Sequence, residues 1–232
     1  VLILLAGPPA SKPDKHAPPP GPPRPLPSPS GRPAPPPSAR AARPRAGASP
    51  VRPPAVAVPT GAATGTAVMR TTRVDAAAIV AWFEARSPGG YRATVPLAEL
   101  VAIFLDEGAA QGIAPDIAFA QSVLETGWFT FPTTGLVRPE DNNFSGLGAV
   151  DDDSAALVAK FPSARLGVRA QVQHLWAYAD PTATAATVAR PPVVDPRFDL
   201  VVPKGKAPYW ELMGSGNWAT DPQYGAKVLA LY

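Results

Sequence analysis

The uneven distribution of proline is the strongest constraint on how this chain can fold. The sequence has 33 prolines in 232 residues, and 20 of them lie between Pro8 and Pro59. Proline lacks a backbone N–H and fixes φ, so this density excludes regular helices and sheets. The same stretch has few large apolar side chains to offset the entropy of ordering it. We therefore predict a disordered Pro/Arg/Ala-rich linker over residues 8–69 and one folded domain over residues 70–232.

The charge of the chain divides at the same boundary. Residues 1–69 carry eight Lys/Arg and one acid, a net charge of +7, whereas residues 70–232 have a net charge of −4. An acidic domain argues against nucleic acid as its partner. The basic tail either keeps the linker soluble and extended or touches anionic wall polymers or lipid head groups.

The first residues suggest export. Residues 1–7 read VLILLAG, an apolar run followed by small residues, which is typical of the later part of a signal peptide or membrane anchor. An apolar segment leading into a Pro-rich spacer predicts a protein that is secreted or associated with the bacterial cell envelope.

Residue usage also excludes several kinds of chemistry. There is no cysteine and there are only two histidines, His16 in the tail and His174 in the domain. Disulfides, thiolate nucleophiles, cysteine-type metal sites and two-histidine metal motifs within the domain are therefore ruled out. We expect no metal and no cofactor.

The folded part is predicted to be mainly α-helical. The clearest amphipathic pattern covers residues 96–111, with apolar residues at helical spacing between Pro96 and the stop at Gly112. A first helix is expected to begin at a cap on Thr71 or Thr72 and to end before residue 87. Three more are expected over residues 115–126, 163–178 and 221–231.

Two long stretches lack helical periodicity. Residues 131–150 are rich in Pro, Gly, Asn and Thr, which predicts a loop with a short β-hairpin around residues 143–150, where a cleft could open. Residues 181–220 are also expected to be rich in loops.

Glu125, in the segment QSVLETGWF, is the candidate proton-handling group. It follows Gln121 by four residues and Ile117 by eight, which places it at the edge of the buried stripe of its helix. Burial, the negative end of the helix dipole and an apolar wall from Trp128 would each raise the pKa of this carboxyl. A carboxylic acid that stays protonated near neutral pH can protonate a leaving glycosidic oxygen. From spacing alone, however, a lone glutamate at a helix end is more often a surface residue.

Four sequence blocks supply the stronger argument. They are IAPDIAFAQSVLETGWF, NNFSGLGA, KFPSARLGVRAQVQHLWAYA and NWATDPQYGAKV, and they run in this order from residue 113 to residue 228. Together they resemble the glucosaminidase domain of bacterial peptidoglycan hydrolases, which is related to the lysozyme superfamily. The resemblance implies a lysozyme-like helical domain with a small irregular or β-hairpin lobe and a groove between them.

The same resemblance implies roles for individual residues. Glu125 matches the catalytic glutamate, with the role of general acid. The segment with Asn142, Asn143, Phe144 and Gly146 matches the groove floor, where amides and exposed backbone can bond to a sugar's acetamido group.

The partner of the acid is less clear from the sequence. Asp151, Asp152 and Asp153 directly follow the groove-floor segment, and one of them could position a water or stabilise an oxocarbenium-like sugar. A solvated acidic loop is the alternative. The family also allows attack by the substrate's own 2-acetamido group, which would need no second carboxylate.

Several aromatic and polar residues remain to be placed. Similar domains commonly have Tyr before ATDPxY, whereas this chain has Trp218, which could stack on a sugar, and keeps Tyr224 as a catalytic candidate or a packing residue. Trp128 is expected to line the cleft. His174 is expected to be structural, and Gln171 and Gln173 to be surface or packing groups.

The resemblance implies an endo-β-N-acetylglucosaminidase that cleaves the GlcNAc–MurNAc bond of peptidoglycan glycan strands and acts as a monomer. A muramidase or a lytic transglycosylase would use a similar acid on the neighbouring bond. A glycan-binding module that kept the groove without turnover is the alternative from another class.

Overall fold

The chain folds as a helical domain, as predicted. The computed structural model describes residues 65–148 and 158–232. The described residues contain isolated β-bridges and no sheet. The α-helices are α1 (Ala76–Arg86), α2 (Leu97–Gln111), α3 (Pro115–Glu125), α4 (Ala164–Ala179) and α5 (Tyr224–Leu231). Short 3-10 helices are η1 (Pro139–Asp141), η3 (Phe198–Leu200) and η4 (Trp210–Leu212).

The ordered part begins before the boundary predicted from composition. Val68 is fully buried, and its N–H donates to the carbonyl of Pro208 at 3.0 Å. Its carbonyl accepts from Ala114 N at 2.9 Å. Residues 65–69 therefore belong to the domain and not to the linker, because their backbone groups bond to it. The remaining linker and residues 1–7 lie outside the described residues. No helix within the described ranges is long and apolar enough to span a membrane.

The first helix is capped by a residue other than the two predicted. Asp75 is the N-cap of α1, and its carboxylate accepts from Ala78 N at 2.8 Å. The Thr72 hydroxyl bonds instead to the carbonyl of Val74. Aspartate is as good an N-cap as threonine, so propensity alone did not separate the candidates.

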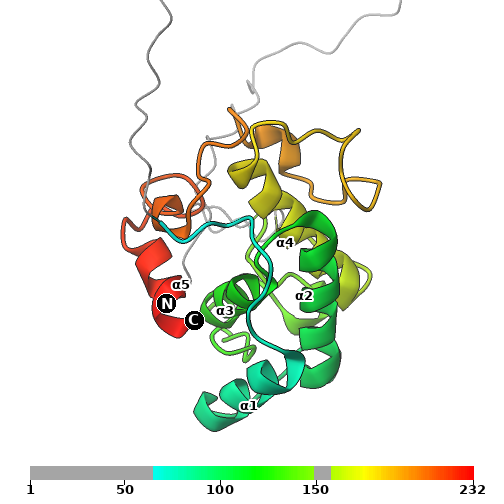
Figure 1. The fold of residues 1–232 in the computed structure, drawn as a ribbon. Coiled ribbons are helices and arrows are strands. Elements are labelled where there is room, and N and C mark those ends of the chain that lie inside the picture. The colour runs from blue at the N-terminus through cyan, green and yellow to red at the C-terminus, as the bar shows by residue number, and fades with distance from the viewer. Residues whose placement is uncertain (1–64, 149–157) are drawn as a thin grey trace, which may run out of the picture. The chain divides into compact units, whose positions relative to one another are not determined.

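Helix α3 is the central element of the fold. Figure 1 shows α3 between α2 and α5, and it packs against both. Nearly all of its residues are buried, including the polar residues Gln121, Ser122 and Glu125. These polar groups must therefore find hydrogen-bond partners inside the protein.

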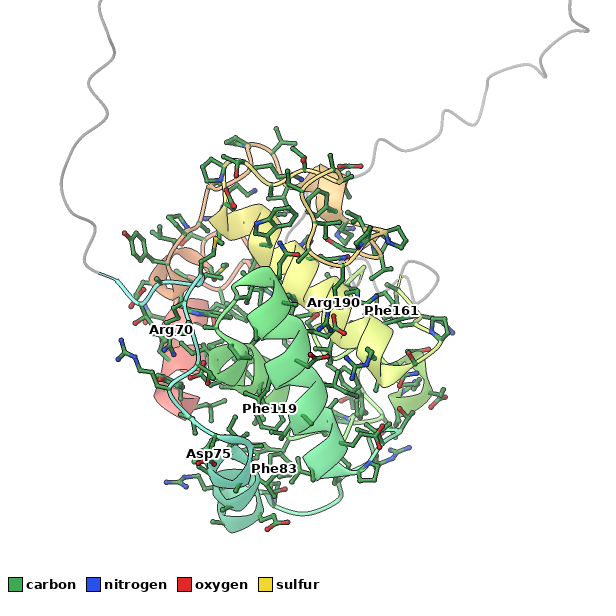
Figure 2. The ribbon with its side chains drawn as sticks, turned by 45° about the vertical axis from the view of Figure 1, so that its right-hand side comes forward. Arg70, Asp75, Phe83, Phe119, Phe161 and Arg190 are labelled. Carbon is green, nitrogen blue, oxygen red and sulfur yellow. The ribbon has the colours of Figure 1, made fainter. Side chains whose placement is uncertain are left out.

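An aromatic core holds the irregular segment after α3 against the helices. Phe83 of α1 and Phe119 of α3 point into this core (Figure 2), with ring centroids 6.1 Å apart. Phe129 lies 5.4 Å from Phe119, and Phe144 lies 6.0 Å from Phe129. Residues 143–148 form turns where a hairpin was predicted, and residues 149–150 lie outside the described ranges. Ring packing can fix this segment without strand pairing.

A buried ion cluster fastens the loop that follows α4. The carboxylate of Glu107 on α2 is 2% exposed and accepts from Arg165 at 2.8 Å, Arg169 at 2.9 Å and Arg190 at 2.7 Å. Arg190 reaches this cluster from the loop (Figure 2). Because a buried charge needs compensating partners, the cluster joins α2, α4 and the loop that carries Asp195.

Candidate active site

Glu125 is the last residue of α3, and a tight turn follows it. The hydroxyl of Thr126 donates to the carbonyl of Ser122 at 2.6 Å and accepts from Phe129 N at 2.8 Å. These bonds satisfy groups that the helix end would otherwise leave unpaired. The chain consequently turns away at once, and the Glu125 side chain stays inside the domain.

Two residues from the C-terminal segment meet the carboxyl of Glu125, which is 5% exposed. Its Oε1 accepts from the Tyr224 hydroxyl at 2.6 Å and from the Trp218 indole N–H at 3.2 Å. Tyr224 is seated by a close helix approach, because a Cβ atom at Gly225 would lie 1.9 Å from the carbonyl oxygen of Trp210. Only glycine allows α5 this close to η4.

The environment sets the protonation state of both groups. Burial raises the pKa of Glu125 to about 8, although the bonds from Tyr224 and Trp218 act in the opposite direction. Burial, followed by the charge of Glu125, raises the pKa of Tyr224 well above its usual value. At neutral pH Glu125 is therefore an uncharged acid and Tyr224 a neutral hydroxyl.

The second oxygen of Glu125 has no hydrogen bond within the described part of the chain. Oε2 is buried and has no hydrogen-bond partner among the described residues. It faces Gly146, where a Cβ atom would lie 3.7 Å from it and where φ is +69°. A buried polar atom left unpaired is unfavourable unless something else, such as a substrate, bonds to it. The acid thus has one oxygen held by the protein and one oxygen free.

The two asparagines near Gly146 are used to build the turn. The side-chain amide of Asn143 donates to the carbonyls of Leu147 at 2.8 Å and Ala159 at 3.0 Å. The amide of Asn142 donates to the carbonyl of Phe161 at 3.0 Å. These amides are thus engaged with backbone groups, which differs from the expectation that they contact a sugar. Through these bonds they fix the backbone that faces Glu125.

Phe144 and Trp218, which were expected to contact a sugar, also make contacts inside the protein. Both side chains are fully buried. Trp218 is drawn inward by its bond to Glu125 and packs against His174, with ring centroids 5.0 Å apart. In the structure Trp218 thus donates to Glu125 from a buried position, and its stacking on a sugar stays a prediction. The structural role predicted for His174 is confirmed, since its Nδ1 bonds to the Asp195 carboxylate at 2.7 Å.

Trp128 lies on another face of α3. Its ring stacks on Trp82 of α1, with centroids 5.4 Å apart and planes 19° apart. It lines a surface hollow between α3 and α5, and Glu125 does not line that hollow. The other lining residues are Val123, Leu124, Gly127, Lys227, Ala230 and Leu231. The cleft-lining role of Trp128 stays a prediction, because this hollow is separate from the acid.

The second carboxylate predicted from sequence cannot be located, because Asp151, Asp152 and Asp153 lie outside the described residues. Within residues 65–148 and 158–232, no group of three His, Asp or Glu side chains is arranged to hold a metal ion.

A buried chain of polar side chains behind Tyr224 was missed by the sequence reasoning. Gln121 donates to the Tyr224 hydroxyl at 2.8 Å, and Gln171 donates to the Gln121 carbonyl oxygen at 2.8 Å. Ser122 donates to the Gln171 carbonyl oxygen at 2.9 Å. All four residues are fully buried, so Gln171 is a core residue. The usable signal was the position of Gln121, one helical turn before the candidate acid on the same helix face.

The raised pKa of Glu125 predicts how stability depends on pH. The pKa of this carboxyl is 4.5 in the unfolded chain, whereas burial raises it to about 8 in the folded protein. The contribution of the protonated carboxyl to the free energy of unfolding is fully present below pH 4.5. It is lost as the pH rises from 4.5 to about 8, by at most about 1.4 kcal/mol per pH unit. Glu125→Gln removes this dependence. Its advantage over wild type, measured by urea denaturation, should grow between pH 4.5 and 8, whereas Glu84→Gln on exposed α1 surface should show no such trend. A constant difference across the window would contradict the assignment.

Comparison with known proteins supports the interpretation of the site. Residues 101–232 match the Glucosaminidase family, described as mannosyl-glycoprotein endo-beta-N-acetylglucosaminidase. A Borreliella burgdorferi protein described as uncharacterized is 37% identical over 126 residues, which are 54% of this chain and 56% of that protein. The chain thus spans little more than half the length of this relative. No solved structure matches. Because the family match covers more than half of the sequence and includes every contact of Glu125 described above, the chain belongs to the Glucosaminidase family.

Proposed function

We propose that this protein is a peptidoglycan hydrolase, an endo-β-N-acetylglucosaminidase that cleaves the GlcNAc–MurNAc bond with Glu125 as general acid. One observation carries the proposal. Within the region that matches a glycosidase family, the buried carboxyl of Glu125 has its pKa raised to about 8, and its Oε2 has no hydrogen-bond partner among the described residues. An acid that is protonated at the working pH is what cleavage of a glycosidic bond requires.

The acid step follows from the different environments of the two oxygens. Oε2 of Glu125 gives its proton to the leaving glycosidic oxygen as the C–O bond breaks, and the bonding electrons stay with that oxygen. The carboxylate that remains keeps two donors on Oε1, from Tyr224 and Trp218. Overall one water is consumed across the broken bond. General acid catalysis of this kind contributes roughly 10²–10⁴-fold to the rate.

A partner must stabilise or attack the sugar on its other side. One of Asp151, Asp152 and Asp153 could do this, or the 2-acetamido group of the substrate itself could attack. Among the described residues, no second carboxylate forms a hydrogen bond with Glu125, Tyr224 or Trp218.

The remaining parts of the proposal follow from composition and substrate. Peptidoglycan glycan strands are the partner, and action on them requires a secreted or cell-envelope location. The net charge of −4 on residues 70–232 argues against nucleic acid. We propose a monomer that uses no cofactor.

The direct test of the proposal is Glu125→Gln in the full chain, with Glu84→Gln as a matched control. The glutamine keeps the shape of the side chain but has no acidic proton. It should lower hydrolysis of purified peptidoglycan at least about 100-fold while glycan binding is retained, and the control should match wild type. Unchanged hydrolysis by Glu125→Gln would refute the acid role, whereas a wild-type protein that binds the glycan without hydrolysing it would indicate a binding module.

Mass analysis of the digest from the same experiment identifies the bond. Reducing GlcNAc ends are the expected product. Reducing MurNAc ends would indicate a muramidase, and anhydro-MurNAc a lytic transglycosylase.

Access to Oε2 can be tested separately at Gly146. A methyl group there would stand 3.7 Å from Oε2, and we propose that the glycosidic oxygen approaches Oε2 from this side. Gly146→Ala should reduce hydrolysis at least about tenfold and lower stability by about 1 kcal/mol, because φ is positive. Gly89→Ala is the matched control, since φ is +89° there and no atom lies within 4 Å of a Cβ. The control should lose similar stability and keep its activity. Equal activity in the two variants would show that substrate does not approach past Gly146.

A further inference from the structure

A series of hydrogen bonds behind Tyr224 allows only one consistent assignment of donors and acceptors. It starts at the backbone carbonyl of Ala118, which can only accept. The side-chain nitrogen of Gln171 donates to this oxygen at 3.1 Å and to the Gln121 carbonyl oxygen at 2.8 Å. The other end of the Gln171 amide, its oxygen, accepts from Ser122 at 2.9 Å. Turning the Gln171 amide over would set its oxygen against the Ala118 carbonyl, where no hydrogen bond is possible.

The direction of the Gln171 amide determines that of Gln121. Because the Gln121 oxygen faces the Gln171 nitrogen, its own nitrogen faces the Tyr224 hydroxyl at 2.8 Å. An amide nitrogen can only donate, so the Tyr224 oxygen accepts there. The hydroxyl hydrogen is then left for Oε1 of Glu125 at 2.6 Å.

Oε1 of Glu125 receives a second donor whose direction is also fixed. The indole N–H of Trp218, 3.2 Å away, has no acceptor capacity. Two donors occupy the two in-plane lone-pair directions of Oε1, so a proton on the carboxyl has no place on that oxygen. It must reside on Oε2, the unpartnered oxygen that faces Gly146.

We infer that Gln171 and Gln121 are positioning residues that fix the direction of the Tyr224 hydroxyl and thereby hold the acidic proton of Glu125 on Oε2. The consequence of this arrangement is delivery of that proton to the glycosidic oxygen, and this consequence rests on the proposed function. Both residues act through Tyr224, and neither touches the carboxyl. Their full burial keeps water from competing for these bonds.

The surroundings of Glu125 allow the effect of these hydrogen bonds on its titration to be measured. Among the described residues, no charged side chain bonds to the carboxyl, which meets Tyr224 from α5 and Trp218 from the preceding loop. His174 packs against Trp218 and is bonded to Asp195. A change in the titration of Glu125 after a substitution at Gln121 or Gln171 therefore reports on the Tyr224 hydroxyl.

The test is a titration of the Glu125 carboxyl by ¹³C NMR in the full chain, with its signal assigned from Glu125→Gln. Gln121→Met frees the Tyr224 oxygen to accept from Oε1, so protonation of Oε1 becomes favourable and the pKa of Glu125 should rise by about one unit. Tyr224→Phe removes a donor to the carboxylate and should shift it in the same direction. Gln171→Met should give a smaller rise, because Gln121 stays in place but is free to turn over.

Gln173→Met is the matched control. Gln173 is also a buried glutamine on α4, but its amide bonds to loop backbone, including Val194 N at 2.7 Å. This variant should lose stability without moving the titration of Glu125. In the Gln121 and Gln171 variants, the basic limb of the pH–rate profile should follow the new pKa, and kcat should fall about tenfold.

The inference is overturned if folded Gln121→Met or Gln171→Met titrates Glu125 like wild type and Gln173→Met. The Gln171 variant alone decides the matter if Gln121→Met does not fold. This titration needs no substrate. Failure of the proposed function, seen as full hydrolysis by Glu125→Gln, is thus distinguished from failure of the positioning role.

Discussion

The burial of one carboxyl group between α3 and the C-terminal segment is the interaction on which this site depends. Glu125 bonds to Trp218 and Tyr224, which lie 93 and 99 residues further along the chain. Removing a carboxyl from water strongly disfavours its charged form. The group therefore stays protonated at neutral pH, and two donors compensate the charge that appears when the proton leaves. Burying the carboxyl lowers local stability, but it keeps the group in the protonated form that a glycosidase requires of its acid.

The rest of the fold supports this contact. The aromatic core holds the segment with Gly146 against α2 and α3. The close approach at Gly225 seats Tyr224, and the ion cluster around Glu107 fastens the loop that carries Asp195. Each of these contacts joins parts of the chain that are distant in sequence. Preorganised groups of this kind need no rearrangement when charge develops during a reaction.

Local sequence patterns predicted the helices and the acid better than they predicted its surroundings. Periodicity placed α2 and α3 within a residue or two, whereas Glu125 was singled out by the resemblance of four ordered sequence blocks to a family and not by its place on the helix. The bond of Trp218 to Glu125 was not predicted, because an indole can stack on a sugar or donate to a carboxylate, and only the tertiary contact decides. Gln121 and Gln171 were missed for the same reason: a glutamine in an amphipathic helix resembles a surface residue until its partners are known. The cap of α1 and the start of the ordered segment at residue 65 likewise depend on competing local bonds and on distant backbone.

Neutron diffraction from a D₂O-exchanged crystal at neutral pD tests the central claim most directly, because it locates the acidic hydrogen. The account predicts deuterium on Oε2 of Glu125 and a Tyr224 hydroxyl deuterium directed at Oε1. Deuterium on Oε1, or a carboxylate without deuterium, would contradict it.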